Sequence, residues 1–298
     1  MGYKIDEKFV VAIASSALFD LSESDKVFQE KGENEYRKYQ REHENHVLKK
    51  GVAFPLIKRL LSVNIDFPPN EAPVEVVLLS RNDPDTGLRV FKSIQHHNLQ
   101  ISRAVFTTGN NPFIYMDAFN ASLFLSANPK DVREAVDLGL PAGCVYPSDY
   151  IDDDNDDELR LAFDFDGIIG DDSAEQIYQE HRTIEPYHVH EISNAAIPLP
   201  PGPLNRFFRE ISILQKKVIQ RHKDHKEYKS KIRIAIATAR NAPAHERVIS
   251  TLREQEIQVD VAFFLGGIEK RRVVEVFKPH IFFDDQVTHV EGVSRIAP

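Results

Sequence analysis

A series of short apolar runs, rich in β-branched and aromatic residues, constrains the fold of this chain more than any other feature. Each run is continuously apolar rather than alternating, which is typical of strands buried on both faces of a parallel sheet. Helix-like stretches such as 203–222 and 245–257 separate the runs, and this alternation predicts βαβ units in an α/β fold. The runs cover residues 9–15, 74–80, 101–107, 122–127, 160–165, 232–238, 259–265 and 280–285.

The two halves of the chain show the same order of apolar runs. An ungapped comparison pairs Ser80 with Thr238, 158 positions later, and keeps Gly109 in register with Gly267. We therefore expect two tandem Rossmann-like units with parallel sheets, although any two α/β halves share some of this rhythm. Residues 140–146 add a fifth strand to the first copy. Its counterpart would begin beyond Pro298, so either the chain is shortened there or the second copy lacks that strand.

An acidic segment separates the halves. All residues from 152 to 158 except Asn155 are acidic, and such a cluster favours a solvated linker. A calcium loop is the alternative, but the Gly and Glu that its spacing requires are missing. We expect a first unit over residues 1–150, a linker over 151–158 and a second unit over 159–298.

The overall charge and the single cysteine limit the partners and the compartment. The formal net charge is −9, and no dense Lys/Arg run is present, which argues against nucleic acid as a partner. Cys144 alone cannot form an internal disulfide, so a reducing cytoplasm fits. No apolar run is long enough to span a bilayer, and no signal peptide is recognised. We expect a cytoplasmic protein without a membrane partner, and the sequence leaves a homo-oligomer open.

The strongest chemical signal is Asp164-Phe165-Asp166-Gly167, directly after an apolar run. Two carboxylates at a strand end project into the crevice where open α/β sheets hold their ligands. Phosphoryl transfer needs a nucleophile and a proton donor for the leaving oxygen, and Asp164 and Asp166 can supply these. Ordinary turn chemistry is the alternative for Asp followed by Gly.

Other predicted strands of the second half also end in polar groups. Thr238 and Arg240 can bind phosphoryl oxygens, and Lys270 is a compact cation that can do the same. Asp284 and Asp285 offer the oxygen ligands that Mg²⁺ prefers. Simpler alternatives exist: Thr238 as a strand-end hydroxyl, Lys270 as a solvated loop charge, and the Asp pair as a helix N-cap.

In this order the four signals resemble the motifs of the haloacid dehalogenase-like (HAD) phosphohydrolases, with Ile168 at a position where that family usually has Thr or Val. A closer resemblance, to the cytosolic 5'-nucleotidase type I family, covers nearly the whole chain. It rests on VAIASSALFD, YRKYQREHEN, AFPLIK, TTGNNP, TAR and KPHIFFDDQ.

This resemblance implies Mg²⁺-dependent hydrolysis of nucleoside 5'-monophosphates, with AMP prominent among them. Asp164 would form an aspartyl-phosphate, Asp166 would be the acid and base, and Thr238 and Lys270 would hold the phosphoryl group. Asp284, with Asp164 and the backbone carbonyl of Asp166, would bind Mg²⁺, and Asp285 would support that site. The alternatives are a phosphatase for sugar phosphates or other small phosphomonoesters, and a catalytically silent nucleotide sensor.

The first copy lacks these charges, which predicts a degenerate, non-catalytic unit. Because the loops differ in length, the offset near the first strand shrinks to 149, which pairs Asp164 with Ser15 and Asp166 with Ala17. The offset of 158 pairs Lys270 with Pro112, Asp284 with Ser126 and Asp285 with Ala127. The turn at Thr108, Gly109, Asn110 and Asn111 is a candidate contact for the substrate or for a nucleotide effector. A plain tight turn is the alternative.

The second copy carries extra chain between its first two strands. Residues 171–230 exceed what a crossover needs, so we expect a small helical cap that expels water from around the phosphate. His181, His188 and His190 lack regular metal-ligand spacing and are interpreted as solvated or hydrogen-bonded loop residues.

Overall fold

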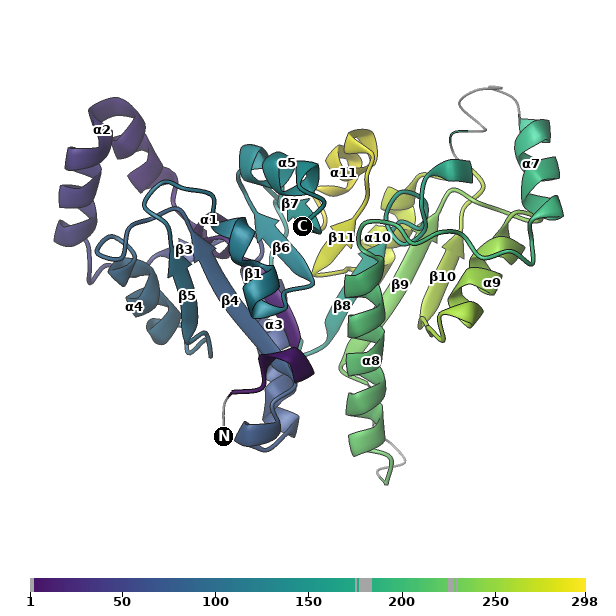
Figure 1. The fold of residues 1–298 in the computed structure, drawn as a ribbon, viewed down its shortest axis with the longest axis horizontal. Helices are drawn as coiled ribbons and strands as arrows, with labels where there is room; N and C mark the ends of the chain where they lie inside the picture. The colour runs from purple at the N-terminus through teal and green to yellow at the C-terminus, as the bar shows by residue number, and fades with distance from the viewer. Residues whose placement is uncertain (1–2, 175, 177–183, 225–227, 229) are drawn as a thin grey trace. The chain divides into compact units, whose positions relative to one another are not determined.

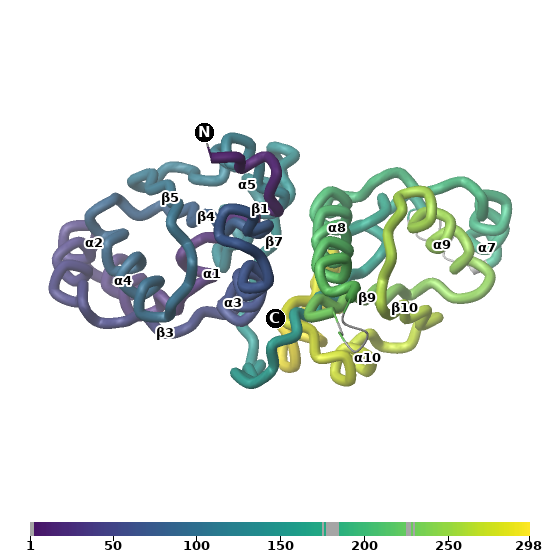
Figure 2. The backbone as a smooth tube through the Cα atoms, turned by 90° about the horizontal axis from the view of Figure 1, so that it is seen from below, coloured from purple at the N-terminus to yellow at the C-terminus, as the bar shows by residue number. Residues whose placement is uncertain are grey.

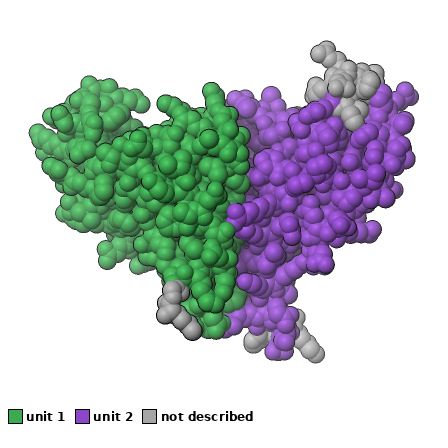
Figure 3. Space-filling view, in the orientation of Figure 1, with its two compact units in different colours: residues 1–146 green, residues 147–298 purple. Residues whose placement is uncertain are grey.

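The computed structural model describes residues 3–174, 176, 184–224, 228 and 230–298. The chain divides into two compact units, residues 1–146 and 147–298, which Figure 3 shows in green and purple. Within the described residues, no helix combines the length and the apolar character that crossing a membrane requires.

Unit 1 is built on a five-stranded parallel sheet with the order β5-β4-β1-β6-β7 (Figure 1). Its central strand β1 is buried throughout, as its continuously apolar sequence predicts. The strands are β1 (Phe9–Ile13), β4 (Val74–Ser80), β5 (Arg103–Phe106), β6 (Leu123–Ser126) and β7 (Ala142–Cys144). A short antiparallel pair, β2 (Phe19–Asp20) and β3 (Lys49–Lys50), stands apart from the sheet.

A side-chain cap marks the start of one helix of unit 1, α5 (Pro129–Asp137). The side chain of Asn128 accepts a hydrogen bond from the backbone N–H of Lys130 and caps the helix that starts at Pro129. The helices are α1 (Ser15–Leu18), α2 (Ser22–Glu42), α3 (Phe54–Ser62), α4 (Leu88–His96) and α5 (Pro129–Asp137), with short 3₁₀ turns η1 (Ile5–Glu7), η2 (Val63–Asp66), η3 (Pro69–Glu71), η4 (Pro112–Tyr115) and η5 (Asp117–Phe119).

Unit 2 repeats the pattern with a four-stranded parallel sheet in the order β10-β9-β8-β11. The strands are β8 (Leu159–Phe163), β9 (Ile232–Thr238), β10 (Val261–Phe264) and β11 (Ile281–Phe283). The described helices are α7 (Ile184–Ser193), α8 (Asn205–Arg221), α9 (His245–Glu254), α10 (Lys270–Phe277) and α11 (Val287–Val293). The predicted α/β fold with two Rossmann-like units is therefore confirmed.

Helix α8 lies within the range expected for a cap, yet it packs on the sheet (Figure 1). The Phe163 ring of β8 contacts Phe207 and Phe208 of α8, at 6.1 and 4.9 Å between ring centroids. These aromatic side chains are fully buried, so α8 belongs to the layer of helices that covers the sheet. The part of 171–230 that remains for a cap is the segment before α8, which includes α7.

Helix α7 runs beside α9 (Figures 1 and 2). His188 and His190 lie on α7 rather than in a loop, and the Nδ1 atom of His190 is 3.0 Å from a carboxylate oxygen of Glu191. His181 lies outside the described residues.

Strand pairing corrects the predicted correspondence between the copies by one residue at the first strand. Ile13 pairs with Leu125 and Phe163 pairs with Phe283, so Asp164 corresponds to Ala14 rather than to Ser15. The backbone N–H of Ala14 donates to the Leu125 carbonyl at 2.8 Å, as that of Asp164 donates to the Phe283 carbonyl at 2.7 Å. The sequence places this pair at an offset of 149, whereas strand pairing gives 150.

The segment expected to be a solvated linker is anchored at its end. The Arg160 guanidinium contacts Asp156 at 2.5 Å and Glu158 at 3.0 Å, and its Nε donates to the Lys278 carbonyl at 2.8 Å. These ion pairs attach the acidic segment to the first strand of unit 2.

Candidate active site

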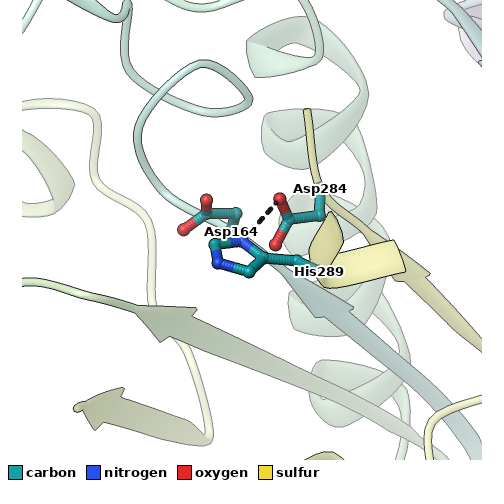
Figure 4. A group of neighbouring side chains, drawn as sticks. All are labelled: Asp164, Asp284 and His289. Carbon is teal, nitrogen blue, oxygen red and sulfur yellow. Dashed lines mark hydrogen bonds and ion pairs between the residues drawn. The ribbon is translucent and has the colours of Figure 1, made fainter. Parts of the chain in front are cut away.

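The carboxyl ends of the strands in unit 2 bring together side chains that are far apart in the sequence. Asp164 follows β8, Thr238 ends β9 and Asp284 follows β11, while Lys270 opens α10 in the connection from β10 to β11. Because neighbouring parallel strands end at the same edge of a sheet, these groups meet there. Figure 4 shows Asp164 and Asp284 side by side, with His289 against them.

Lys270 bridges the two carboxylates. Its Nζ atom lies 2.6 Å from Asp164 Oδ2 and 2.6 Å from Asp284 Oδ2, and all three side chains are almost completely buried. Burial raises the pKa of Asp164 and the negative charge of Asp284 raises it further, which together outweigh the opposing effect of Lys270. For Lys270, burial lowers the pKa, but the two carboxylates overcome this and leave it raised. One ammonium group thus faces two acidic groups.

The same cluster has the chemistry of a divalent-cation site. Ligand atoms of Asp164, Asp284 and His289 lie within 4.8 Å of one another. Asp284 Oδ1 accepts a hydrogen bond from the Gln286 backbone at 2.9 Å and lies 3.2 Å from His289 Nδ1. Carboxylate oxygens suit a hard cation, and a buried pair whose charge Lys270 balances only in part would be stabilised by one.

Asp166 points to a different partner. Arg240 donates from Nε to Asp166 Oδ2 at 2.8 Å and from Nη2 to Asp166 Oδ1 at 2.7 Å, a two-pronged contact with both oxygens. Sequence analysis assigned Arg240 to a phosphoryl oxygen, whereas in the structure its guanidinium binds carboxylates.

A second carboxylate, Glu191 of α7, also binds Arg240. Glu191 Oε2 accepts from Arg240 Nη1 and Glu191 Oε1 accepts from Arg247 Nη1 at 2.9 Å. The side chains of Glu191 and Arg240 are 0% and 1% exposed. Burial works against the charge of Glu191, but the two arginines overcome it and hold the pKa of that carboxyl below its usual value.

The turn after Asp166 requires glycine. Gly167 has a φ of +73°, and a Cβ built on it would lie 2.5 Å from Asp285 Oδ2. The Asp285 carboxylate therefore lies against this turn, outside the group formed by Asp164, Asp284 and His289. Thr238 is fully buried, and its Oγ1 accepts from the Arg240 backbone N–H at 3.2 Å.

The remaining predicted contacts belong to unit 1. The backbone N–H groups of Thr108 and Gly109 donate to Asn82 and Arg81 carbonyls at 3.1 and 2.7 Å, and Asn110 Nδ2 donates to the Thr107 carbonyl. The Asn111 side chain makes no capping bond at the start of η4. The turn is thus held by hydrogen bonds to the segment after β4 and by one within the turn.

Two residues of the site were missed by sequence analysis, Glu191 and His289. His289 could have been found, because a short helix that starts after Asp284 returns a side chain five residues later towards it. Glu191 carries no comparable signal, since the segment around it follows no strand end.

Comparison with known proteins shows which family this chain resembles in sequence. A family model described as 5'-nucleotidase matches residues 1–298. Cytosolic 5'-nucleotidase 1B of Homo sapiens is 32% identical over 291 residues, which are 96% of this chain and 47% of that protein, so the chain spans about half the length of this relative. Among solved structures, histidinol dehydrogenase from Elizabethkingia anophelis aligns at 7% identity over 97% of this chain and 79% of that chain. Its TM-score of 0.21 is too low to support any argument.

Proposed function

Since the chain belongs to the 5'-nucleotidase family, we propose that it hydrolyses nucleoside 5'-monophosphates, AMP among them, to nucleoside and inorganic phosphate. The observation that carries the proposal is the convergence of Asp164, Lys270 and Asp284 at the carboxyl end of the unit 2 sheet, with 2.6 Å between Lys270 and each carboxylate. Such a cluster is what phosphoryl transfer requires.

Two displacements account for the reaction. A carboxylate oxygen of Asp164 attacks phosphorus, the bond from phosphorus to the ribose 5'-oxygen breaks, and Asp166 gives its proton to that oxygen so that the nucleoside leaves. Water then attacks the aspartyl-phosphate, Asp166 takes the proton from the water, and phosphate is released. One water molecule is consumed, Asp164 is regenerated as a carboxylate, and Asp166 regains the proton that it gave.

Lys270 and Thr238 act on the phosphoryl group in this scheme. The Lys270 ammonium already contacts Asp164 Oδ2, so it lies beside the carboxylate that attacks. Thr238 ends the neighbouring strand, and its hydroxyl can donate to a phosphoryl oxygen. Both groups offset negative charge as the two anions approach.

Asp164 and Asp284 would hold Mg²⁺, together with the backbone carbonyl of Asp166, while Asp285 supports the turn at Gly167. When bound, the cation neutralises phosphoryl charge and so permits the attack of a carboxylate on a phosphate anion. The buried acidic pair that Lys270 balances only in part supports this assignment.

The remaining assignments concern partners and location. Unit 1 would be a degenerate copy without catalytic groups, and its turn at 108–111 would contact the substrate or a nucleotide effector. A cytoplasmic location is supported by the name of the human relative and by the single cysteine.

Release of phosphate from a panel of nucleoside monophosphates and sugar phosphates, with Mg²⁺ or with a chelator, tests the proposal. We expect Mg²⁺-dependent release from the nucleotides, and a loss of about 10³-fold or more in Asp164→Asn. Asp157→Asn is the matched control, because its side chain is 75% exposed in the linker. Release from sugar phosphates alone would favour the phosphatase alternative, and no release from any compound would favour a nucleotide sensor.

A further inference from the structure

Glu191 is a buried charge on a helix outside the cluster formed by Asp164, Lys270 and Asp284. It comes from α7, in the extra chain between β8 and β9, and its side chain is 0% exposed. Each of its oxygens contacts a different arginine, Arg240 or Arg247. A carboxylate is rarely buried in this way unless it is paired, and here the pairing connects α7 to the helices and loops beside the sheet.

Arg240 divides its donors between two carboxylates. Nε and Nη2 bind the two oxygens of Asp166, while Nη1 binds Glu191 and makes a longer contact, at 3.4 Å, with the Ala244 carbonyl. A guanidinium group is planar and rigid, so fixing Nη1 also fixes the direction in which Nε and Nη2 point. The plane of the Asp166 carboxylate therefore depends on the contact between Arg240 and Glu191.

The charges of this group alternate. Along the chain of contacts the order is Asp166, Arg240, Glu191 and Arg247, with two negative and two positive groups. Arg247 is fixed in turn, because its Nε donates to the Ile197 carbonyl at 2.9 Å. Loss of the negative charge at Glu191 would remove a carboxylate from both buried guanidinium groups. Arg240 would keep Asp166, and Arg247 would lose its carboxylate partner in this chain of contacts.

We propose that Glu191 is a positioning residue for the acid and base Asp166, acting through the guanidinium group of Arg240. This inference rests on the proposed function, because it assigns Glu191 a part in the proton transfer that releases the nucleoside. The Glu191 side chain is 0% exposed and both of its oxygens bind arginines, so its loss should slow the step that needs a proton and leave nucleotide binding nearly unchanged.

A pair of substrates separates positioning from a merely structural role. In AMP the leaving group is an alkoxide, which needs the proton of Asp166. In the analogue with sulfur in place of the bridging 5'-oxygen, the leaving group is a thiolate, which departs without one because thiols are far more acidic than alcohols. Apart from this bridging atom, the two compounds are identical, including the transferred phosphoryl group.

The variant to measure is Glu191→Gln, with kcat and KM determined for both compounds. We expect kcat/KM for AMP to fall about 10- to 100-fold, and that for the sulfur analogue to fall less than about threefold. KM for AMP should change less than about threefold. Asp166→Asn provides the reference pattern, and Glu191→Asp should restore part of the AMP activity. Glu185→Gln is the matched control, because Glu185 lies exposed on the same helix.

The outcomes distinguish this inference from the proposed function. An equal loss for both compounds in Glu191→Gln would make Glu191 a structural anchor and overturn the inference, while wild-type turnover of AMP would leave the proposed function standing. Failure of the wild type to hydrolyse either compound would overturn both. If Glu191→Gln does not fold, the charge-balanced variant Glu191→Gln with Arg247→Met replaces it, and an unchanged ratio between the two compounds in that variant would again overturn the inference.

Discussion

At the scale of single residues, burying both Asp164 and Asp284 beside a single ammonium group, that of Lys270, has a cost for stability. Two buried carboxylates share one ammonium group, and the pKa of Asp164 is raised, chiefly by burial. The folded protein therefore binds a proton at this position more tightly than the unfolded chain does. In the absence of a divalent cation, the negative charge on Asp164 destabilises the fold.

Asp164→Asn should therefore stabilise the protein in a chelating buffer, by an amount that depends on pH. The folded pKa lies above the ordinary value of 3.8, so the contribution of Asp164 to stability is complete below that value and is lost as the pH rises towards the folded pKa. The advantage of the variant should grow from about pH 4 upwards, by at most about 1.4 kcal/mol per pH unit.

Denaturant unfolding of both proteins at several pH values measures this difference, and Mg²⁺ should reduce it by stabilising the wild type more than the variant. If the difference in the free energy of unfolding between Asp164→Asn and the wild type is the same at pH 5 and pH 8, the argument is contradicted.

Gly167→Ala should disrupt the turn that follows Asp166. The residue has a φ of +73°, and the added methyl group would meet the Asp285 carboxylate at 2.5 Å. We expect a loss of about 1–3 kcal/mol in the free energy of unfolding, together with reduced activity. Gly292→Ala in α11 is the control, since nothing lies within 4 Å of the place that its added Cβ would take and its φ is ordinary. Similar losses in both variants would exclude the proposed cause.

At the scale of secondary structure elements, α8 is attached to the sheet by aromatic contacts. The Phe208 ring is fully buried and lies 4.9 Å from Phe163, at an interplanar angle of 77°. Phe208→Ala should cost about 3–5 kcal/mol in the free energy of unfolding. Ile213→Ala, on the same helix at 49% exposure, should cost less than about 1 kcal/mol, as chemical denaturation of the two variants would reveal.

The turn between β5 and η4 offers a test of the nucleotide-binding role of unit 1. The Asn111 side chain makes no capping bond at the start of η4, so its removal should leave the turn intact. If this turn contacts nucleotide, Asn111→Ala should raise KM about tenfold or abolish the response to an added nucleotide. Steady-state kinetics with several nucleotides would decide, and unchanged constants throughout would remove the hypothesis.

The elements were predicted more completely than the contacts between them. Each apolar run became a strand, because burial on both faces leaves a continuous apolar sequence. Asp164, Thr238 and Asp284 could be found since they follow such runs directly. The second carboxylate partner of Arg240 could not, because Glu191 lies on a helix in the insert between β8 and β9, and only tertiary packing brings it to the site.

At the scale of the whole molecule, β5-β4-β1-β6 of unit 1 and β10-β9-β8-β11 of unit 2 have the same order along the chain. The two units differ in the side chains at the carboxyl ends of these strands. The residues of unit 1 at the positions of Asp164, Thr238 and Asp284 are Ala14, Ser80 and Ser126. Ser80 Oγ lies 3.0 Å from Ser15 Oγ, so buried hydroxyl groups replace the charged cluster. The described residues of unit 1 that take these positions thus offer no carboxylate to a cation.

Hydrogen exchange with and without Mg²⁺ tests this difference within one molecule. We expect added protection of backbone amides around Asp164 and Asp284, and none around Ala14 and Ser126. The latter two positions are the internal control for the former. Protection of equal size in both units would show that the first copy also binds the cation.

The alternating charges of Asp166, Arg240, Glu191 and Arg247 have a consequence for how such a chain can evolve. A change at one position leaves an opposite charge buried without its counterpart, so single substitutions there should be selected against. Substitutions should instead occur together, with acidic and basic residues lost or exchanged in pairs. An alignment of many relatives should therefore show correlated substitution between positions 191 and 247, while position 185 on the same helix varies independently.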